Sequence, residues 1–308
     1  MVSAFGGRIK KSGSNNIGKN MDEEKITTAE EITRQIVRKF RKPIWGKFLE
    51  GIKNYELIQE GDKVAVCISG GKDSMLMAMC MKQLQKYSKV PFEVEYLVMD
   101  PGYAPANRER IIENAALLNI PVKIFDTRIF DAVEIIGKNP CYMCARMRRG
   151  YLYKNAKELG CNKIALGHHF DDVIETILMG MLCGSQIQTM MPKLHSEHFP
   201  GMQLIRPMYM VREEDIIRWR DLNGLKFLNC ACSVTQTIGV NGDGGSKRQE
   251  IKQLLKQLRS LDPAVDMHIF RSVENVNLQT LISYHIGEEY HHFLDTYDEG
   301  RNIRGTVT

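Results

Sequence analysis

Apolar and polar positions alternate between strand-like and helix-like patterns from Lys63 onward. The continuous apolar run Val64 to Ile68 is typical of a strand buried on both faces of a parallel sheet. Further strands are predicted at 94–99, 122–125, 163–166 and 203–210, and helices at 73–87, 106–118, 143–159 and 171–183. This order predicts an α/β fold with a doubly wound, mostly parallel five-stranded sheet, in which ligands bind at the carboxyl ends of the strands.

The segments on either side of this region give four expected parts of the chain. Residues 1–20 are rich in Gly, Ser, Asn and Lys without apolar periodicity, and we expect a flexible leader there. Residues 21–62 are expected to form a basic helical segment, with an amphipathic stretch from Thr28 to Lys53. Residues 63–232 form the expected ligand-binding α/β domain. Residues 233–308 are expected to be a helical extension, including helices at 247–261, 264–276 and 288–298.

Composition and charge narrow the class of protein. The chain has 308 residues and a formal net charge of +5, so any affinity for nucleic acid depends on local clusters rather than on bulk charge. No apolar run approaches the roughly 20 residues that cross a bilayer. The first residues also lack the apolar core of a signal peptide. We therefore expect a cytoplasmic protein with no membrane partner.

A glycine-rich loop follows the first predicted strand and begins the next helix. Its residues are Ser69, Gly70, Gly71, Lys72, Asp73 and Ser74. Glycines let the backbone approach an anion, and helix-start amides together with a lysine meet the charge of a phosphate. Asp73 beside the phosphates would repel them unless it positions Mg²⁺ or a helix end. The spacing matches neither G-x-x-x-x-G-K-[ST] nor G-x-G-x-x-G, which disfavours a kinase or a dehydrogenase.

Two other strand ends carry polar residues toward the same edge of the predicted sheet. Asp100 ends the second strand, and Gly167, His168, His169, Phe170, Asp171 and Asp172 join the fourth strand to its helix. Histidines and carboxylates at this edge indicate a role in nucleotide or Mg²⁺ binding. Asp171 and Asp172 could equally cap the helix that they begin.

Eight cysteines in a large chain without a predicted signal peptide are more typical of reduced thiols or metal ligands than of disulfides. Cys141 and Cys144 form a CxxC before a predicted helix, and Cys230 and Cys232 form a later CxC. These four residues could hold a structural zinc ion, or three of them could hold a [4Fe–4S] cluster with one iron open to a non-protein sulfur. The other cysteines are expected to be small buried hydrophobic residues, namely Cys67, Cys80, Cys161 and Cys183.

The loop Ser69–Ser74 resembles the pyrophosphate loop of the N-type ATP pyrophosphatases, or PP-loop superfamily, whose sheet is of the adenine nucleotide alpha-hydrolase type. Further motifs are similar, in the same order, to those of the TtcA-type tRNA 2-thiocytidine synthetases. These motifs are CYMCARMRRGYLY, KIALGHHFDDVIETIL, IRPMYMVREEDI and CACS, and the resemblance covers roughly 63–232. Zinc-finger ligands of the related uridine-thiolating enzymes are absent before Cys67 and after Cys232, which favours the cytidine branch.

The resemblance implies that ATP and Mg²⁺ activate the C2 oxygen of an anticodon-loop cytidine, which sulfur then replaces. ATP would contact the loop together with Asp100, Gly167, His168 and Asp171, and Lys72 and Asp73 would act in catalysis. Cys141, Cys144 and Cys232 would hold the oxygen-sensitive [4Fe–4S] cluster. The family has CxxC where this chain has Cys230-Ala231-Cys232, so Cys230 competes as the third ligand.

The expected partners are tRNA, a sulfur donor such as a cysteine desulfurase, and a second copy of the chain in a homodimer. Arg146, Arg148 and Arg149 are candidates to bind tRNA phosphates, although their adjacency requires at least one to face inward or sideways. The basic stretch Thr28 to Lys53 is either a solvated face or a further RNA contact. Two alternatives stay open: an ATPase of this class that modifies another tRNA base through a cysteine persulfide, and a non-catalytic nucleotide and cluster sensor.

Overall fold

The computed structural model describes residues 28–130, 132, 140–228 and 247–297 of the 308-residue chain, and of 140–142 it describes the backbone alone. The expected leader at 1–20 and both Cys230 and Cys232 lie outside the described residues. Among the helices that are described, none is long and apolar enough to cross a membrane.

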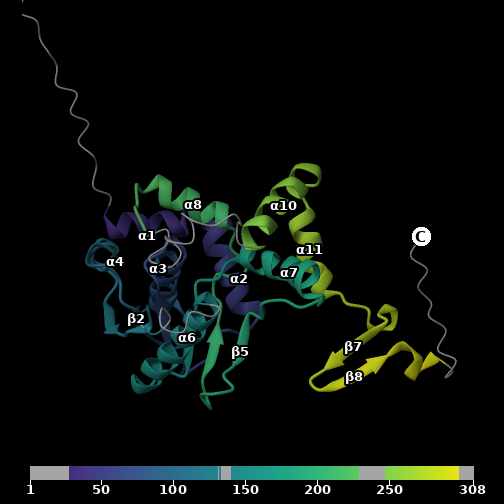
Figure 1. The fold of residues 1–308 in the computed structure, drawn as a ribbon. Helices are drawn as coiled ribbons and strands as arrows, with labels where there is room; N and C mark the ends of the chain where they lie inside the picture. Colours follow the sequence, from purple (N-terminus) through teal and green to yellow (C-terminus); the bar gives the residue numbers. More distant parts are fainter. Residues whose placement is uncertain (1–27, 131, 133–139, 229–246, 298–308) are drawn as a thin grey trace, which may run out of the picture.

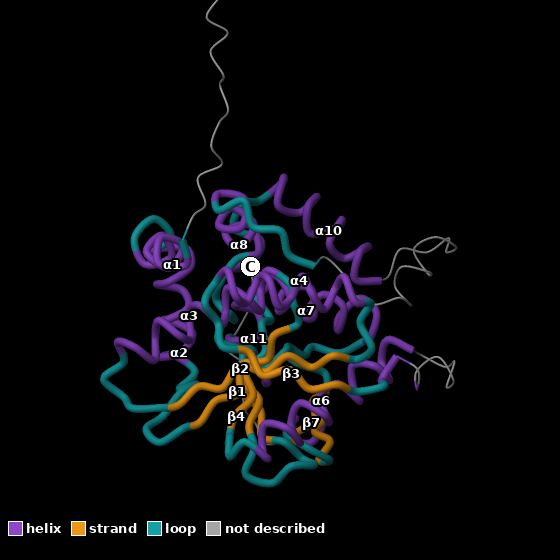
Figure 2. Tube along the Cα trace, turned by 90° about the vertical axis from the view of Figure 1, so that its left-hand side faces the viewer, coloured by secondary structure: helices purple, strands orange, loops and turns teal. Residues whose placement is uncertain are grey.

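A six-stranded sheet forms the centre of the molecule, with its strands in the order β3-β2-β1-β4-β6-β5 (Figure 2). Five strands are parallel, and β5 runs antiparallel beside β6. The chain passes from β1 through β2 to β3 and then returns to β4 on the other side of β1, so the sheet reverses its direction of winding between β1 and β4. The strands are β1 (Lys63–Ile68), β2 (Glu93–Asp100), β3 (Val122–Asp126), β4 (Lys163–Ala165), β5 (Lys193–His195) and β6 (Gln203–Ile205).

Helices cover both faces of the sheet. Successive side chains of β1 point to opposite faces, so they enter two different cores. Val64, Val66 and Ile68 belong to the core that α3 and α8 cover, whereas Ala65 and Cys67 belong to the core beneath α6. A third core joins α7 to α10 and α11. The predicted doubly wound α/β class is confirmed. The helices around the sheet are α3 (Lys72–Tyr87), α4 (Pro105–Leu117), α6 (Pro140–Glu158), α7 (Phe170–Gly184), α8 (Glu213–Leu222), α10 (Lys247–Leu261) and α11 (Val265–Glu274).

The predicted count of five strands is wrong, because β5 adds a sixth at the edge of the sheet. It has three residues, two of them the polar Lys193 and His195, which is too short and too polar to show an apolar period. The strand predicted at 203–210 is also too long. β6 ends at Ile205, and Pro207 follows, which has no N–H to donate to a strand ladder.

The basic N-terminal segment is helical, as predicted, but it is divided into three pieces. Helix α1 (Ala29–Val37) begins with a capping box between Thr28 and Glu31, a π-helical turn spans Arg41–Gly46, and α2 (Lys47–Asn54) follows. The π-helical turn contains Pro43, which cannot donate a helical hydrogen bond. Six basic side chains of this segment are exposed, and none forms an ion pair with another described residue: Arg34, Arg38, Lys39, Arg41, Lys42 and Lys53.

The C-terminal extension contains a β-hairpin where a helix was predicted at 288–298. Strand β7 (Ser283–Ile286) pairs antiparallel with β8 (Glu289–His292), and Gly287 in the turn has φ +64°. A two-residue turn with glycine at positive φ suits a hairpin. Tyr284, Ile286 and Tyr290 also favour strand over helix. In Figure 1 the hairpin extends to one side of the molecule, beyond α11.

Candidate functional site

The glycine-rich loop joins β1 to α3 and leaves the start of that helix open. Gly71 is the N-cap residue, with φ −81° and ψ 161°, and no side chain among the residues that the structure describes caps the helix. Ser74 closes the loop, because its Oγ accepts from the Ser69 amide at 3.1 Å and donates to the Gly71 carbonyl at 3.0 Å. The first amides of α3 therefore remain available to an anion, as at other helix N-termini that bind phosphate.

Two glycines make the loop possible. Gly70 has φ +86°, and a Cβ there would lie 2.6 Å from Cγ1 of Ile111. Gly167, just after β4, lies against the start of α3, where a Cβ would be 3.1 Å from both N and Cα of Ser74. The end of β4 and the loop after β1 therefore meet at the point where the sheet reverses direction, which is where open α/β sheets bind ligands.

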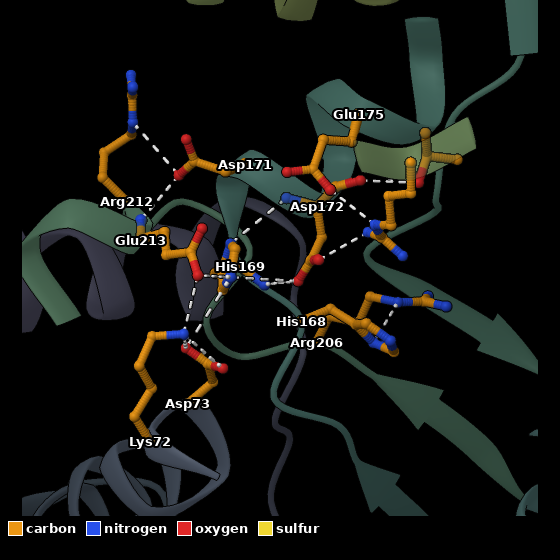
Figure 3. A network of polar contacts seen from close by, with 12 residues as sticks. Lys72, Asp73, His168, His169, Asp171, Asp172, Glu175, Arg206, Arg212 and Glu213 are labelled. Carbon is orange, nitrogen blue, oxygen red and sulfur yellow. Dashed lines mark hydrogen bonds and ion pairs between the residues drawn. The ribbon is translucent and has the colours of Figure 1, made fainter. Parts of the chain in front are cut away.

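Lys72 lies between two carboxylates at this point (Figure 3). Its Nζ is 3.1 Å from Oδ1 of Asp73 and 2.9 Å from Oε1 of Glu213. Burial opposes the charge of Glu213, but the hydrogen bond from Lys72 and the nearby positive charges together outweigh burial and lower the pKa of Glu213 to about 2. Burial likewise opposes the charge of Lys72, yet the two carboxylates raise its pKa above the ordinary value. Lys72 therefore stays charged and is held in place.

His169 connects this group of charges to α7. Its Nδ1 accepts from the Asp172 amide at 3.4 Å, and the Asp172 carboxylate accepts from the His169 amide, so the two residues form a capping box. Nε2 of His169 lies 3.9 Å from both Oδ1 of Asp73 and Oε1 of Glu213. The alternative that Asp172 caps its helix is thus confirmed.

His168 lies beside Arg206, which follows β6 (Figure 3). Nε of Arg206 donates to Nδ1 of His168 at 3.3 Å, and burial, with Arg206 nearby, lowers the pKa of His168 to about 4. The imidazole is therefore neutral, with its proton on Nε2. Arg206 is only 7% exposed and donates to the Met191 carbonyl, but it forms no ion pair with any carboxylate in the described part of the chain. Burial lowers the pKa of Arg206 to about 10.

The predicted nucleotide ligands Asp171 and Asp100 have their carboxylates engaged elsewhere. Asp171 accepts from the Glu213 amide at 2.7 Å and from Arg259 at 2.6 Å, which ties α7 to α8 and α10. Asp100 accepts from the amides of Gly102 and Tyr103 and pairs with Arg108 at 2.7 Å. In this structure both carboxylates hold the backbone around the site, and a role in binding nucleotide stays a prediction for each.

Helix α6 brings part of the cysteine motif to the second core. Cys144 is half-buried and packs against that core. Arg148 turns inward and donates to Oη of Tyr103 at 3.3 Å, whereas Arg146 and Arg149 are exposed. This confirms that the three arginines cannot all face the same way. The side chain of Cys141 lies outside the described residues, as do Cys230 and Cys232.

The chain returns to the phosphate loop shortly before the later cysteine motif. The amide of Leu228 donates to the carbonyl of Gly70 at 3.2 Å, and Leu228 is two residues before Cys230 in the sequence. Its Cδ1 would lie 3.1 Å from a Cβ at Gly70. Leu228, the last described residue before Cys230 and Cys232, is therefore bonded to the phosphate loop itself.

Three residues of the site were not singled out from the sequence: Glu213, Arg206 and Arg248. Arg248 of α10 binds Asp172 and Glu175 at 2.7 Å each. Arg206 and Glu213 lie in the motif IRPMYMVREEDI and Arg248 lies in a charged helix, but their roles were not predicted because the contacts join residues far apart in the chain. In the described part of the chain, no three or more His, Cys, Asp or Glu side chains are arranged to hold a metal ion by themselves.

Fold and site together define a member of the PP-loop class, and a family model described as PP-loop domain matches residues 34–236. Within that class, the chain belongs to the family of tRNA-cytidine(32) 2-sulfurtransferases. It is 34% identical over 241 residues to the tRNA-cytidine(32) 2-sulfurtransferase of Vibrio cholerae serotype O1 (strain O395), across 77% of this chain and 75% of that protein. The enzyme of the same name from Vibrio parahaemolyticus is 36% identical over 234 residues, across 73% and 74%. The predicted family is confirmed.

A solved structure supports the same fold. The U34-tRNA thiolase NcsA from Methanococcus maripaludis, determined with its [4Fe-4S] cluster, superposes with a TM-score of 0.59 over 74% of this chain and 76% of that one. Its sequence identity is 21%, so the similarity concerns the fold alone.

Proposed function

We propose that this chain is a cytoplasmic, ATP-dependent tRNA sulfurtransferase that converts cytidine 32 to 2-thiocytidine. The proposal rests on the relatives of that name and, in the structure, on one observation: the amide of Leu228, at the entrance to the later cysteine motif, donates to Gly70 of the phosphate loop at 3.2 Å. A base activated at the loop would thus be close to the chain that carries the sulfur chemistry.

The residues around the loop fit ATP. The uncapped start of α3 offers its amides to phosphate, and Lys72 adds a positive charge that is already in place. The C2 oxygen of the cytosine would attack the α-phosphate of ATP, and pyrophosphate would leave. Lys72 and the α3 amides would stabilise the negative charge that develops on the phosphates. Mg²⁺ would bind mainly through the phosphates, with Asp73 as the carboxylate closest to them in the loop.

Cys144 fits a ligand of an iron–sulfur cluster. It is half-buried at the edge of an apolar core. Arg148 follows four residues later, one turn along the same helix, and places a positive charge near the position proposed for the cluster. We propose Cys141, Cys144 and Cys232 as the ligands, with Cys230 as the competitor for the third position. The cluster, when bound, would supply the site that carries the sulfur.

Exposed arginines and lysines are the proposed contacts to tRNA. Arg146 and Arg149 face solvent on α6, close in sequence to Cys144, and the six exposed basic residues of the N-terminal helices have no described carboxylate partner. Arg148 donates to Tyr103, so it is better placed to orient that residue than to bind phosphate. A cysteine desulfurase as sulfur donor and a homodimer are further proposals, and both follow from the resemblance.

The experiment is an anaerobic assay of the purified chain with ATP, Mg²⁺, a tRNA transcript and sulfide as the source of sulfur, in which AMP and 2-thiocytidine are both measured. We expect the wild-type chain to contain iron and sulfide and to form both products. Lys72→Ala should lose both by about 100-fold, as is typical when one charge-stabilising donor is removed. Cys144→Ser should lose 2-thiocytidine. Lys86→Ala, an exposed change at the far end of the same helix, is the matched control.

Two results would contradict the proposal in different ways. Zinc without sulfide, together with normal AMP formation, would remove the cluster and leave the ATP chemistry. Binding of ATP with no AMP in the presence of tRNA would favour the non-catalytic sensor instead.

A further inference from the structure

His168 and Arg206 form a fixed pair at the carboxyl edge of the sheet. His168 lies just beyond β4, and Arg206 directly follows β6. Nε of Arg206 donates to Nδ1 of His168 at 3.3 Å, and Nη1 of Arg206 donates to the Met191 carbonyl. In Figure 3 the pair lies to the right of His169, whereas Lys72 lies to its left. Two hydrogen bonds therefore fix the direction of both side chains.

Each side chain of the pair has one further N–H donor. Because Nδ1 of His168 accepts a hydrogen bond, the neutral ring carries its proton on Nε2, and Nη2 is the remaining amino group of Arg206. Neither of these two nitrogens donates to a described residue, and neither is sealed from solvent. Arg206 as a whole is only 7% exposed, so the pair presents two directed donors at an otherwise buried position.

The described carboxylates near the pair are already engaged. Asp172 and Glu175 both bind Arg248, at 2.7 Å each. Arg149 of α6 is exposed and forms no ion pair with a described residue. Burial, together with the charge of Arg149, lowers the pKa of Arg206, so the two guanidinium groups lie within electrostatic reach of each other. The pair and Arg149 thus combine free donors with positive charge that no described carboxylate neutralises.

These donors suit the oxygens of a phosphate group. An imidazole N–H beside a guanidinium offers two directed hydrogen bonds and a positive charge, and hydrogen bonds from a guanidinium to phosphate are among the strongest in proteins. Two phosphate sources are available to an enzyme of this class, namely ATP and the backbone of tRNA.

The position of the pair favours the tRNA backbone. In the strand order β1-β4-β6, Arg206 is two strands away from the phosphate loop, which at about 4.8 Å per strand is roughly 10 Å. The phosphates of ATP are expected on the amides of α3 and on Lys72, at the loop itself. A base that reacts at the loop carries its own backbone phosphate at some distance, beyond the ribose, and that phosphate can lie on the side away from ATP.

We propose that His168 and Arg206 form a subsite for the backbone phosphate of the tRNA nucleotide whose base reacts at the loop, with Arg149 at the rim. The inference rests on the proposed function, because it takes tRNA as the substrate. It gives His168 a contact to RNA in place of the ATP contact that the resemblance implied. A nucleotide that leaves its stack loses the neighbours that oriented it, and a fixed phosphate contact restores its position.

The first test measures the affinity of the full chain for tRNA at several salt concentrations, without ATP. Arg206→Met should weaken binding about tenfold, as expected for one charge-assisted contact. The slope of log K against log salt concentration should become less steep by about 0.7, the value of one phosphate contact in a single strand. The dissociation constant for ATP, measured by calorimetry, should not change.

Lys86→Met is the matched control for the first test. Lys86 is an exposed lysine in the last turn of α3, so the change removes one positive charge in the same way. Both dissociation constants and the salt slope should equal those of the wild-type chain. Weaker ATP binding by Arg206→Met at unchanged tRNA affinity overturns the inference, because the pair would then hold a phosphate of the nucleotide.

The second test keeps the wild-type chain and changes the RNA. Full-length tRNA, ligated from synthetic halves, carries an uncharged methylphosphonate on one side or the other of cytidine 32. One of these two RNAs should bind the wild-type chain about tenfold more weakly and should show little further loss with Arg206→Met, because both changes remove the same contact. No loss from either methylphosphonate, or losses that add to that of Arg206→Met, overturns the inference.

The subsite and the proposed function fail by different results. A wild-type chain that binds tRNA but forms neither AMP nor 2-thiocytidine contradicts the proposed chemistry, while the subsite is still decided by the two binding tests. A wild-type chain that forms both products, with Arg206→Met binding tRNA equally tightly, contradicts the subsite alone.

Discussion

Among the single residues of the site, Arg206 is a charge that no carboxylate of the described residues balances. Lys72 faces Asp73 and Glu213, and Arg248 faces Asp172 and Glu175, whereas Arg206 is buried against His168 and a carbonyl. Burying an unpaired charge is costly, so such a residue is retained where an anionic ligand completes its environment. The position of Arg206 just after β6, at the carboxyl edge of the sheet, makes a phosphate or the activated base the natural ligand.

We therefore expect Arg206→Met to lower thiolation at least tenfold without lowering the free energy of unfolding, because the variant replaces an uncompensated buried charge by an apolar side chain of similar length. Urea denaturation and the anaerobic assay measure the two effects. A loss of more than about 2 kcal/mol of stability with full activity would mean that Arg206 is structural instead.

His168 gives a prediction for the pH dependence of stability. Its pKa is about 4 in the folded chain against an ordinary value of 6.5, mainly because it is buried. The unfolded chain thus binds a proton as the pH falls below about 6.5 while the folded chain does not, so this residue reduces stability progressively from about pH 6.5 down to about 4. His168→Gln should remove that part of the slope, worth about 1 to 3 kcal/mol at pH 4. An unchanged slope in denaturation measured from pH 4 to 7.5 would contradict the assigned neutral state.

At the scale of elements, the approach of β4 to the start of α3 decides whether the loop keeps its shape. A Cβ at Gly167 would press on backbone atoms of Ser74 at 3.1 Å, and backbone cannot move aside as a side chain can. We expect Gly167→Ala to weaken ATP binding about tenfold or more, measured by calorimetry. Gly150→Ala is the matched control, since a Cβ there meets nothing within 4 Å. On α6 that control should gain about 0.5–1 kcal/mol of stability and bind ATP normally.

Elements with a long apolar period could be predicted from the sequence, and short or partner-dependent ones could not. β1, α3 and β2 are buried over most of their length, and the residues 63–100 were predicted almost to the residue. β5 and the β7–β8 hairpin lack a buried face, so nothing in their apolar pattern distinguishes them. Cys183 was predicted to be buried but is exposed, because it lies at the end of α7, beyond the reach of the core.

The site was predictable only where one segment carries it. The loop Ser69–Ser74 is a local motif and was found. The partner of Lys72, Glu213, is 141 residues away, and the hydrogen bond from Arg206 to His168 also spans 38 residues. Contacts of this kind depend on the packing of α7 and α8 against the sheet, which no local pattern records.

For the whole molecule, Asp171 links the site to the C-terminal helices. It holds the Glu213 amide and Arg259, and Arg259 also binds Asp266 of α11 at 2.9 Å. Removing one member of a buried charge pair costs about 3–5 kcal/mol. Asp171→Ala should therefore increase amide exchange throughout α10 and α11, which mass spectrometry detects. Lys256→Ala, an exposed change on α10 at a side chain that pairs with no described carboxylate, is the control and should leave exchange unaltered.

The function of the whole molecule is tested most directly by the nucleoside content of tRNA. The chain would be expressed in a bacterial strain that lacks its own tRNA-cytidine(32) 2-sulfurtransferase, and 2-thiocytidine would be quantified in purified tRNA by mass spectrometry. We predict that the wild-type chain restores 2-thiocytidine at position 32 and that Lys72→Ala and Cys144→Ser, expressed to the same level, do not. Absence of 2-thiocytidine with the wild-type chain, or its appearance with Lys72→Ala, would contradict the account.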